Sequence, residues 1–251
     1  MSKITAVILA AGKGKRMGSD EGSEIPKVMF KIHGRPMIEY SIENMQKAGI
    51  ERIVLVVGYK KEMVIKDIGG EVEYAVQEEQ LGTGHAAMQA RKILEGKSKA
   101  VIICYGDMPL FRPETIRNLI NTFEKEKPTI AMLTVDFNDP EFWAYGRIIR
   151  NKEGYVDAIV EQKDCTPEQL KVKESNPGFY IFDDKWLWKN FELLSTNNSQ
   201  HEYYLTDMIH IAKEQGKKII AVKVSDKNEV LGINTPEQLE KVEQILRKNH
   251  E

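Results

Sequence analysis

The sequence predicts an α/β protein with a parallel or mixed sheet and helices on both faces. Short apolar runs, typical of strands buried on both faces, alternate with amphipathic helical stretches through the first half of the 251 residues. Proline and glycine stand where helices begin and end, as Pro36 and Gly49 do around one helical stretch. This repeated strand–helix–strand order needs crossover connections, and such connections produce parallel pairing.

Strands and helices of the first half follow one another in order along the chain. Apolar runs predict strands over residues 4–10, 52–57, 73–76, 100–105 and 129–135. Helical patterns predict helices over residues 36–48, 60–67, 84–94 and 113–125. Ligands bind beyond the carboxyl ends of the strands in such sheets, so the loops that follow the strands are the candidate ligand site.

The pattern changes after about residue 140. Two short runs predict a hairpin over residues 147–150 and 155–161. The further elements expected are a strand over 173–182, a helix over 203–215, a strand over 218–224 and a helix over 235–248. No linker rich in proline, glycine or serine separates the halves, and no hexapeptide β-helix repeat is present. We therefore expect one domain, 1–251, in which a small β-rich elaboration, 141–251, closes over residues 1–140.

The charge balance favours a small anionic ligand over a polyanion. Lys and Arg number 36 against 38 Asp and Glu, a net charge of −2, so no nucleic-acid partner is expected. Cys104 and Cys165 lack the spacing of a metal site, and Cys104 lies in an apolar run, as a core thiol does. The first apolar run is too short to span a membrane and lacks the features of a signal peptide. A cytoplasmic protein with no membrane partner is therefore expected.

The loop after the first strand has the composition of a phosphate-binding loop. Gly12 and Gly14 let backbone N–H groups approach a phosphate chain. The cations that would neutralise its charge are Lys13, Lys15, Arg16 and Lys27. Met17 stands where a dinucleotide fingerprint needs its third glycine, and no window of the chain supplies a Walker loop. The loop therefore predicts a nucleoside triphosphate site of another kind.

A second loop, residues 77–84, also follows a strand. Its two glutamines and its Gly-Thr-Gly turn offer amide groups and exposed backbone to a base edge or a sugar hydroxyl. The alternative is a helix-entry loop with Thr83 or Gly84 near the N-cap. His85, which opens the helix, is more typical of a capping or packing residue than of a catalyst.

Asp107 follows the buried strand 100–105 on a glycine turn, where a carboxylate is well placed to hold a hard cation. Metal-dependent nucleotidyl transfer needs such a carboxylate, because the ion neutralises charge that develops on the phosphates. The alternative is that Asp107 only caps the turn. The weaker candidates are Gly146, Glu161, Asn176, Asn234 and the run 202–206. For Gly146, Glu161, Asn176 and Asn234 the alternative is a turn, cap or strand-edge role.

Several motifs, in their order and approximate spacing, resemble the sugar nucleotidyltransferase (nucleoside-diphosphate-sugar pyrophosphorylase) family. They are the first loop with Pro26-Lys27, QEEQLGTGHA, YGDMPL, YGRI, VEQKD, QHEYYLTD and GINT. The resemblance covers residues 4–246 and is closest to the uridylyltransferases that act on N-acetylglucosamine 1-phosphate. It implies a Rossmann-like fold with a mixed, mostly parallel sheet. It also implies a Mg²⁺-dependent reaction of UTP with N-acetylglucosamine 1-phosphate, which yields UDP-N-acetylglucosamine and pyrophosphate.

The resemblance implies a role for each residue that matches a family motif. The catalytic residues would be Arg16, Lys27 and Asp107. The nucleotide would contact Leu9, Ala11, Gly12, Lys27, Gln77, Gln80, Gly82 and Thr83. The sugar would contact Tyr105, Gly146, Glu161, Asn176 and Thr206. The Mg²⁺ ligands would be Asp107 and Asn234. Residues 1–140 would then form the nucleotide-binding part, and residues 141–251 the sugar-binding part, of one nucleotidyltransferase domain.

The chain departs from the family pattern in three places. An acidic insertion of about four residues, within 20–24, lies beside the phosphate loop. Position 15 is lysine where the family usually has a small hydroxyl residue, and Pro177 follows Asn176 where the family has a small residue. The C-terminal β-helix acetyltransferase domain of the bifunctional members is not expected in this chain.

Alternatives remain for the substrate and for the activity. The nearest keeps the chemistry and uses glucose 1-phosphate, another hexose phosphate or dTTP. A second is a non-catalytic subunit that senses nucleotide sugars, against which stands the presence of all four residues Arg16, Lys27, Asp107 and Asn234. An NAD-dependent oxidoreductase does not fit, because the third glycine of its fingerprint is missing.

Overall fold

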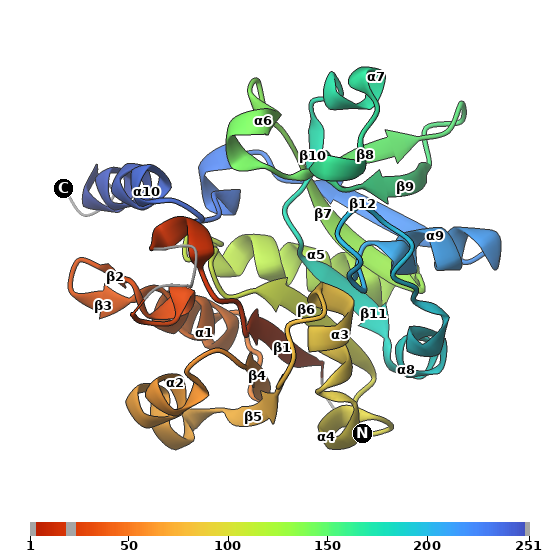
Figure 1. Cartoon of the computed structure of the whole chain (residues 1–251). Helices are drawn as coiled ribbons and strands as arrows, with labels where there is room; N and C mark the ends of the chain where they lie inside the picture. Colours follow the sequence, from red (N-terminus) through yellow and green to blue (C-terminus); the bar gives the residue numbers. More distant parts are fainter. Residues whose placement is uncertain (1–3, 19–23, 249–251) are drawn as a thin grey trace.

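A single mixed sheet forms the centre of the molecule (Figure 1). The structure is a computed structural model that describes residues 4–18 and 24–248, and ten strands of these residues pair in this sheet. In order across the sheet, the strands are β5 (Glu73–Val76), β4 (Ile53–Val57), β1 (Thr5–Ala10), β6 (Ala100–Tyr105), β11 (Tyr180–Asp183), β7 (Ile130–Asp136), β10 (Glu174–Asn176), β8 (Gly146–Arg150) and β9 (Val156–Val160). The remaining strand, β12 (Ile219–Lys223), pairs with β7 in parallel.

Most strands run in the same direction, as the sequence predicts. β5, β4, β1 and β6 form a parallel block, whereas β11, β10 and β9 run against their neighbours. Leu9 of β1 lies opposite Tyr105 of β6, so the loops after these two strands leave the same edge of the sheet. The mixed, mostly parallel sheet of the predicted fold class is confirmed.

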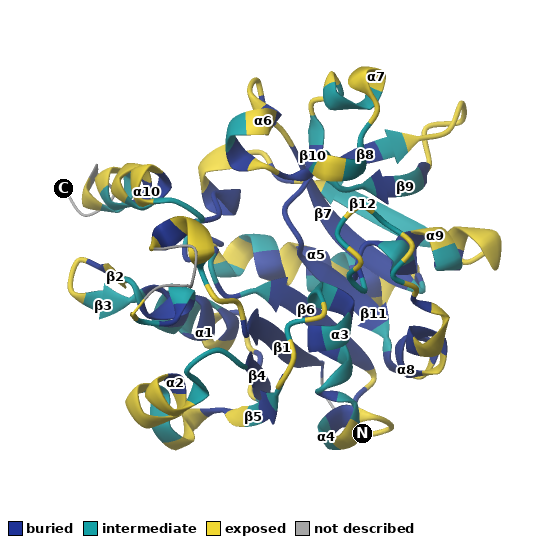
Figure 2. Ribbon diagram, in the orientation of Figure 1, coloured by how far each residue is buried: buried dark blue, intermediate teal, exposed yellow. Residues whose placement is uncertain are grey.

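Helices cover both faces of the sheet, because alternate residues of each buried strand point to opposite faces. Ile8 and Ile102 belong to one apolar core, and Val7 and Ile103 to the other. The first core includes residues of α1 (Met37–Lys47), α2 (Lys61–Ile68), α5 (Pro113–Glu126) and α10 (Pro236–Lys248). The second includes residues of α3 (Thr83–Met88), α4 (Arg91–Leu94), α8 (Asp184–Asn190) and α9 (Asp207–Glu214). Figure 2 shows buried residues along the central strands and exposed residues on the outer turns of α2 and α10.

Strands from the two halves of the chain pair directly. β11 lies between β6 and β7, and β10 joins β7 to the hairpin of β8 and β9. The expected hairpin is confirmed, with its turn between Arg150 and Val156. The division into a nucleotide-binding and a sugar-binding part stays a prediction.

Three predicted elements are wrong in detail. The helix expected over 84–94 is divided into α3 and α4, which are separated by Gln89 and Ala90. The strand expected over 173–182 is divided into β10 and β11, because Gly178 adopts a φ of +71°. This turn is stabilised by a hydrogen bond that the Gly178 N–H donates to Asn176 Oδ1 at 3.0 Å.

The third correction concerns the helix expected over 203–215, which begins only at Asp207. The preceding segment pairs instead with the loop before α3. The Tyr203 N–H donates to the Leu81 carbonyl at 2.8 Å, and the Gly84 N–H donates to the Tyr203 carbonyl at 2.7 Å. Long-range hydrogen bonding therefore replaces the first turn of the expected helix and joins two motifs that lie far apart in the sequence.

Several short elements were not expected. They are β2 (Lys31–Ile32), β3 (Arg35–Pro36), α6 (Pro140–Trp143), α7 (Pro167–Leu170) and α8. Within the described ranges, no helix combines the length and apolarity needed to cross a bilayer. Cys104 is buried, as expected, and burial raises the pKa of its thiol.

Replacing Gly178 by alanine is expected to destabilise the protein more than the same change at Gly216. Both glycines have positive φ, +71° and +63°, so alanine costs a similar backbone strain of about 1–2 kcal/mol at each. A Cβ at Gly178 would meet Tyr105 Cε2 at 2.0 Å, whereas at Gly216 no described atom lies within 4 Å. Overpacking should cost about 1–3 kcal/mol more at Gly178. Urea denaturation of both variants measures this difference, and equal losses would contradict the packing described here.

Candidate functional site

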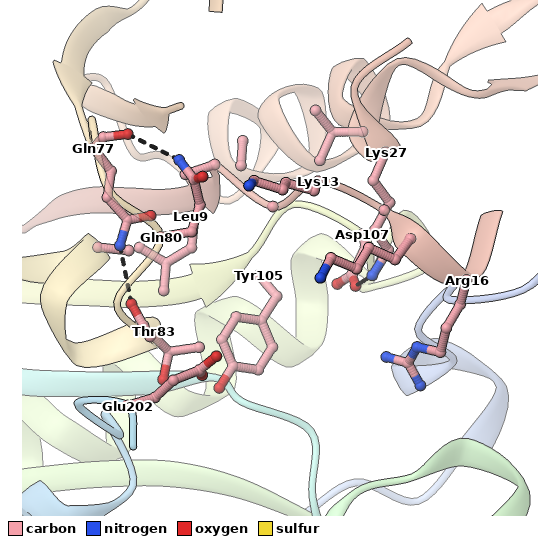
Figure 3. Close-up of a pocket in the computed structure, with 18 of the residues that line it drawn as sticks. Leu9, Lys13, Arg16, Lys27, Gln77, Gln80, Thr83, Tyr105, Asp107 and Glu202 are labelled. Atoms are coloured by element: carbon pink, nitrogen blue, oxygen red, sulfur yellow. Dashed lines mark hydrogen bonds and ion pairs between the residues drawn. The ribbon is translucent and has the colours of Figure 1, made fainter. Parts of the chain in front are cut away.

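Two adjoining cavities open where the loops leave the carboxyl ends of β1, β5 and β6. The larger, of about 570 Å³, is lined by the glycine loop after β1, by the loop before α3 and by Lys27 (Figure 3). The smaller, of about 240 Å³, is lined mostly by residues of the second half of the chain. Both cavities are lined by Arg16, Thr83, Tyr105, Asp107, Gln200 and Glu202. The two spaces therefore meet at a shared set of polar residues.

The glycine loop is held in place by its backbone, while its cations remain exposed. The Tyr59 N–H donates to the Ala11 carbonyl at 3.2 Å, which fixes the start of the loop. Gly14 has a φ of +65°, and a Cβ there would lie 2.9 Å from Lys27 Cβ. Only glycine allows the loop to pack this closely against Lys27. The exposed side chains of Lys13 and Arg16 line the larger cavity, so they would be available to an anion there without rearrangement of the backbone.

A cluster of charged and amide groups stands where the cavities meet. The Lys27 ammonium forms an ion pair with Asp107 Oδ2 and donates to Asn234 Oδ1 at 2.7 Å. The Arg16 guanidinium donates to the same Asn234 oxygen at 2.8 Å. A backbone hydrogen bond of 3.0 Å from the Ile233 N–H to the Asp107 carbonyl brings this C-terminal turn to the end of β6. The cluster thus combines residues from three distant segments.

The oxygens of this cluster fit a hard divalent cation. The Lys27 ammonium already lies between a carboxylate and an amide oxygen, so this position accepts positive charge. Asp107 Oδ1 is buried and has no hydrogen-bond partner among the described residues. Among residues 4–18 and 24–248, no group of three His, Cys, Asp or Glu side chains is suited to hold a metal. Two protein ligands suit Mg²⁺, which completes its shell with water and substrate phosphates.

The loop before α3 presents a buried amide to the larger cavity. Gln77 is only 3% exposed, and its Nε2 donates to the Gly82 carbonyl at 3.1 Å. Gln80 Nε2 donates to the Gln77 carbonyl at 3.2 Å, and both side chains line the cavity wall (Figure 3). Gly82 has a φ of +107°, and a Cβ there would lie 2.6 Å from the Tyr203 carbonyl. The close pairing of the two segments therefore requires glycine at this position.

Side chains with sugar-binding chemistry line the smaller cavity. Burial raises the pKa of the Glu161 carboxyl, although a hydrogen bond of 3.0 Å from Thr206 Oγ1 opposes this shift. Asn176 Nδ2 donates to the Tyr180 hydroxyl at 2.7 Å, which fixes the amide at the cavity wall. A Cβ at Gly146 would lie 3.0 Å from Ile159, so glycine keeps this wall close-packed. A carboxylate and an amide at one wall can exchange hydrogen bonds with hydroxyl and acetamido groups.

The structure brings almost all of the predicted site residues to these two cavities. The predicted nucleotide contacts all line the larger one: Leu9, Ala11, Gly12, Lys27, Gln77, Gln80, Gly82 and Thr83. The predicted residues that line the smaller one are Arg16, Tyr105, Asp107, Gly146, Glu161, Asn176 and Asn234. Thr206 is 1% exposed and lines neither cavity, and its hydroxyl donates to Glu161, which lines the smaller one. The roles of these residues stay predictions.

Sequence reasoning missed several residues of the cavity walls. They are Lys163, Gln200 and Trp143, whereas Glu202 and Tyr204, which also line the walls, belong to the weaker candidates. Lys163 and Gln200 stand in the motifs VEQKD and QHEYYLTD, so the sequence contained a signal, but the position of Gln200 depends on the pairing of Tyr203 with the loop before α3. Trp143 is 5% exposed, packs against Phe142 and also lines the smaller cavity. Residues 20–23 of the acidic insertion lie outside the described residues.

Curated relatives match the chain over nearly its whole length. The bifunctional protein GlmU of Acetivibrio thermocellus is 44% identical over 247 residues, which cover 98% of this chain and 52% of that protein. The bifunctional protein GlmU of Clostridium novyi is 48% identical over 244 residues, which cover 97% and 52%. The chain therefore spans about half the length of these relatives.

Solved structures share the fold. A crystal structure of apo UDP-glucose pyrophosphorylase superposes with a TM-score of 0.79 at 19% identity and covers 100% of both chains. A UDP-glucose pyrophosphorylase complexed with UDP-glucose superposes with a TM-score of 0.75 at 19% identity and covers 99% of this chain and 100% of the other. At this level of identity the likeness concerns the fold alone. The MobA-like NTP transferase domain family matches residues 6–159, more than half of the chain. The chain belongs to the family of MobA-like NTP transferase domains, as its resemblance to the nucleotidyltransferases predicts.

Proposed function

We propose that this chain transfers the uridylyl group of UTP to N-acetylglucosamine 1-phosphate, with release of pyrophosphate and with Mg²⁺ as cofactor. The observation that carries the proposal is the meeting of two cavities at a cluster of Lys27, Asp107, Asn234 and Arg16. A nucleotide in the larger cavity and a sugar phosphate in the smaller would bring their phosphates together at this cluster. The choice of uracil as the base and N-acetylglucosamine as the sugar is supported by the motifs that resemble those of the uridylyltransferases.

The reaction needs positioning and charge neutralisation more than proton transfer. An oxygen of the sugar phosphate, ionised at neutral pH, attacks the α-phosphorus of UTP. The bond between the α-phosphorus and the bridging oxygen breaks, and its electron pair leaves with pyrophosphate. No general base is required, so the carboxylates of Asp107, Glu161 and Glu202 at the cavity walls need not accept a proton. In-line positioning of the two phosphates supplies much of the rate.

The cations of the site would act on the phosphates directly. Arg16 lines both cavities, so it can contact the phosphates of both substrates. Lys27 is 15% exposed at its side chain and stands at the junction, where it would neutralise charge on the α-phosphate. Mg²⁺ held by Asp107 and Asn234 would add positive charge on the same phosphates. These groups would stabilise the charge that develops as the bond to pyrophosphate breaks.

A matrix of nucleoside triphosphates against sugar 1-phosphates, with Mg²⁺ and a pyrophosphate assay, tests the substrates. UTP with N-acetylglucosamine 1-phosphate is expected to give the highest kcat/KM. The comparison pairs are UTP with glucose 1-phosphate and dTTP with either sugar. A different best pair would contradict the substrate assignment, and no turnover with any pair would favour a sensing subunit.

Asp107→Asn and Lys27→Ala are expected to lower kcat by about 10²–10³-fold, because each removes charge that acts on the phosphates in the transition state. Asp136→Asn and Lys218→Ala are matched controls, since each breaks an exposed ion pair, Asp136–Lys223 or Lys218–Glu126. The controls should keep their activity. Circular dichroism and thermal melting check that all four variants fold. Wild-type turnover in a folded Asp107→Asn or Lys27→Ala variant would contradict the assignment of that residue to the catalytic site.

Glu161→Gln tests which substrate each cavity binds, because Glu161 lines only the smaller one. The glutamine keeps the shape and still accepts the bond from Thr206, but it loses the negative charge. The KM for N-acetylglucosamine 1-phosphate is expected to rise about tenfold, because a bond to a charged acceptor is weakened. The KM for UTP should change by less than about twofold, since Glu161 lines only the smaller cavity. A rise in the KM for UTP alone would show that the cavities are assigned the wrong way round.

A further inference from the structure

We propose that His85 is a positioning residue that holds the amide of Gln77 in the orientation that selects uracil over cytosine. The inference rests on the proposed function, because it assumes that the larger cavity takes the base of a pyrimidine nucleotide. His85 itself is absent from the residues that line either cavity. It would therefore act on the base only through Gln77.

The orientation of the Gln77 amide follows from its partners. The group that lies 3.1 Å from the Gly82 carbonyl must be the NH₂ of Gln77, because a carbonyl oxygen can only accept a hydrogen bond. The same nitrogen lies 3.0 Å from Nδ1 of His85. Both hydrogens of the NH₂ group are thus used inside the protein. The remaining group, Oε1, is a pure acceptor, and Figure 3 shows the Gln77 side chain at the cavity wall with its nitrogen already hydrogen-bonded within the protein.

The bond between Gln77 and His85 requires a neutral imidazole with its lone pair on Nδ1. A second amide, Gln89 Nε2, lies 3.2 Å from Nε2 of His85 and also donates to the His85 carbonyl at 2.9 Å. A neutral ring has one lone pair for two amide donors, and burial decides which donor receives it. Gln77 is 3% exposed and cannot turn a hydrogen to water, whereas Gln89 is only partly buried. The lone pair of the ring therefore lies on Nδ1, where it accepts from Gln77, and the ring proton lies on Nε2.

This arrangement distinguishes the two common pyrimidines at one atom. N3 of uracil carries a hydrogen and donates to an acceptor such as Gln77 Oε1. N3 of cytosine has no hydrogen, so two lone pairs would face one another. A half-turn of the Gln77 amide would reverse this preference by presenting NH₂ to the base. His85 and the Gly82 carbonyl oppose that half-turn, because each would lose its donor.

Three variants of His85 test the inference through the ratio of kcat/KM for UTP to that for CTP. His85→Leu keeps bulk and removes the acceptor, and it is expected to lower this ratio roughly tenfold or more. His85→Asn can place its Oδ1 near the position of Nδ1 and should keep most of the ratio. His85→Gln is polar but places its amide near the position of Nε2, so it should behave like His85→Leu. Because His85→Asn and His85→Gln are both polar, their comparison stands even if His85→Leu fails to fold.

Two further variants separate positioning from a general structural role. Gln89→Leu removes the other contact of the ring and should leave the ratio unchanged. Gln77→Ala should lower the ratio by itself, and adding His85→Leu to it should have no further effect on the ratio. Equal losses for UTP and CTP in His85→Leu and His85→Gln would overturn the inference, as would an effect of His85→Leu that persists without Gln77.

Binding constants for UTP and CTP, measured by calorimetry on the same variants, give the ratio without turnover. Failure of the proposed function would appear as a wild-type chain that makes no UDP-sugar. Failure of this inference alone would appear as a wild-type chain that prefers UTP and keeps that preference in His85→Gln.

Discussion

The contact that the site depends on is the charged contact between Lys27, Asp107 and Asn234. It joins the segment after the glycine loop, the end of β6 and the turn before α10, which lie up to 207 positions apart. Asp107 Oδ1 is buried and lacks a hydrogen-bond partner in the part of the chain that the structure describes, and the desolvation of such a carboxylate costs folding free energy. A ligand that interacts with this oxygen would offset the cost. The charged contact stands at the junction of two cavities, where a ligand with phosphates would share the positive charge of Lys27 and Arg16. The cluster therefore joins three distant segments at the place where the two cavities meet.

The parallel block of the sheet explains why these groups meet. β1 and β6 are neighbours and run in the same direction, so the glycine loop and Asp107 leave the sheet side by side. The antiparallel strand β11 begins near the same edge, with Tyr180 opposite Ile103, and the glycine turn at Gly178 just before it holds Asn176 at the wall of the smaller cavity. The second half of the chain thereby supplies one wall of the cleft whose floor belongs to the first.

Local patterns in the sequence predicted the features that depend on neighbouring residues. The buried strands, the phosphate loop and the carboxylate at the end of β6 follow from apolar runs and the residues directly after them. Long-range pairing decided the rest. The helix start at Asp207 and the cavity-lining positions of Gln200 and Glu202 depend on hydrogen bonds between Tyr203 and residues 81–84. The division of β10 from β11 depends on a positive φ at Gly178, where Tyr105 leaves no room for a side chain. No window of sequence contains those contacts.

In the proposed reaction, the two cavities hold the donor nucleotide and the acceptor phosphate on either side of one charged cluster. The most direct measurement uses UTP labelled at the α-phosphorus, mixed with N-acetylglucosamine 1-phosphate, Mg²⁺ and the protein, with the products separated by chromatography. The label is expected to enter the UDP-sugar in step with the release of unlabelled pyrophosphate. Label in the pyrophosphate fraction, or release of pyrophosphate without formation of a labelled UDP-sugar, would contradict the proposed reaction.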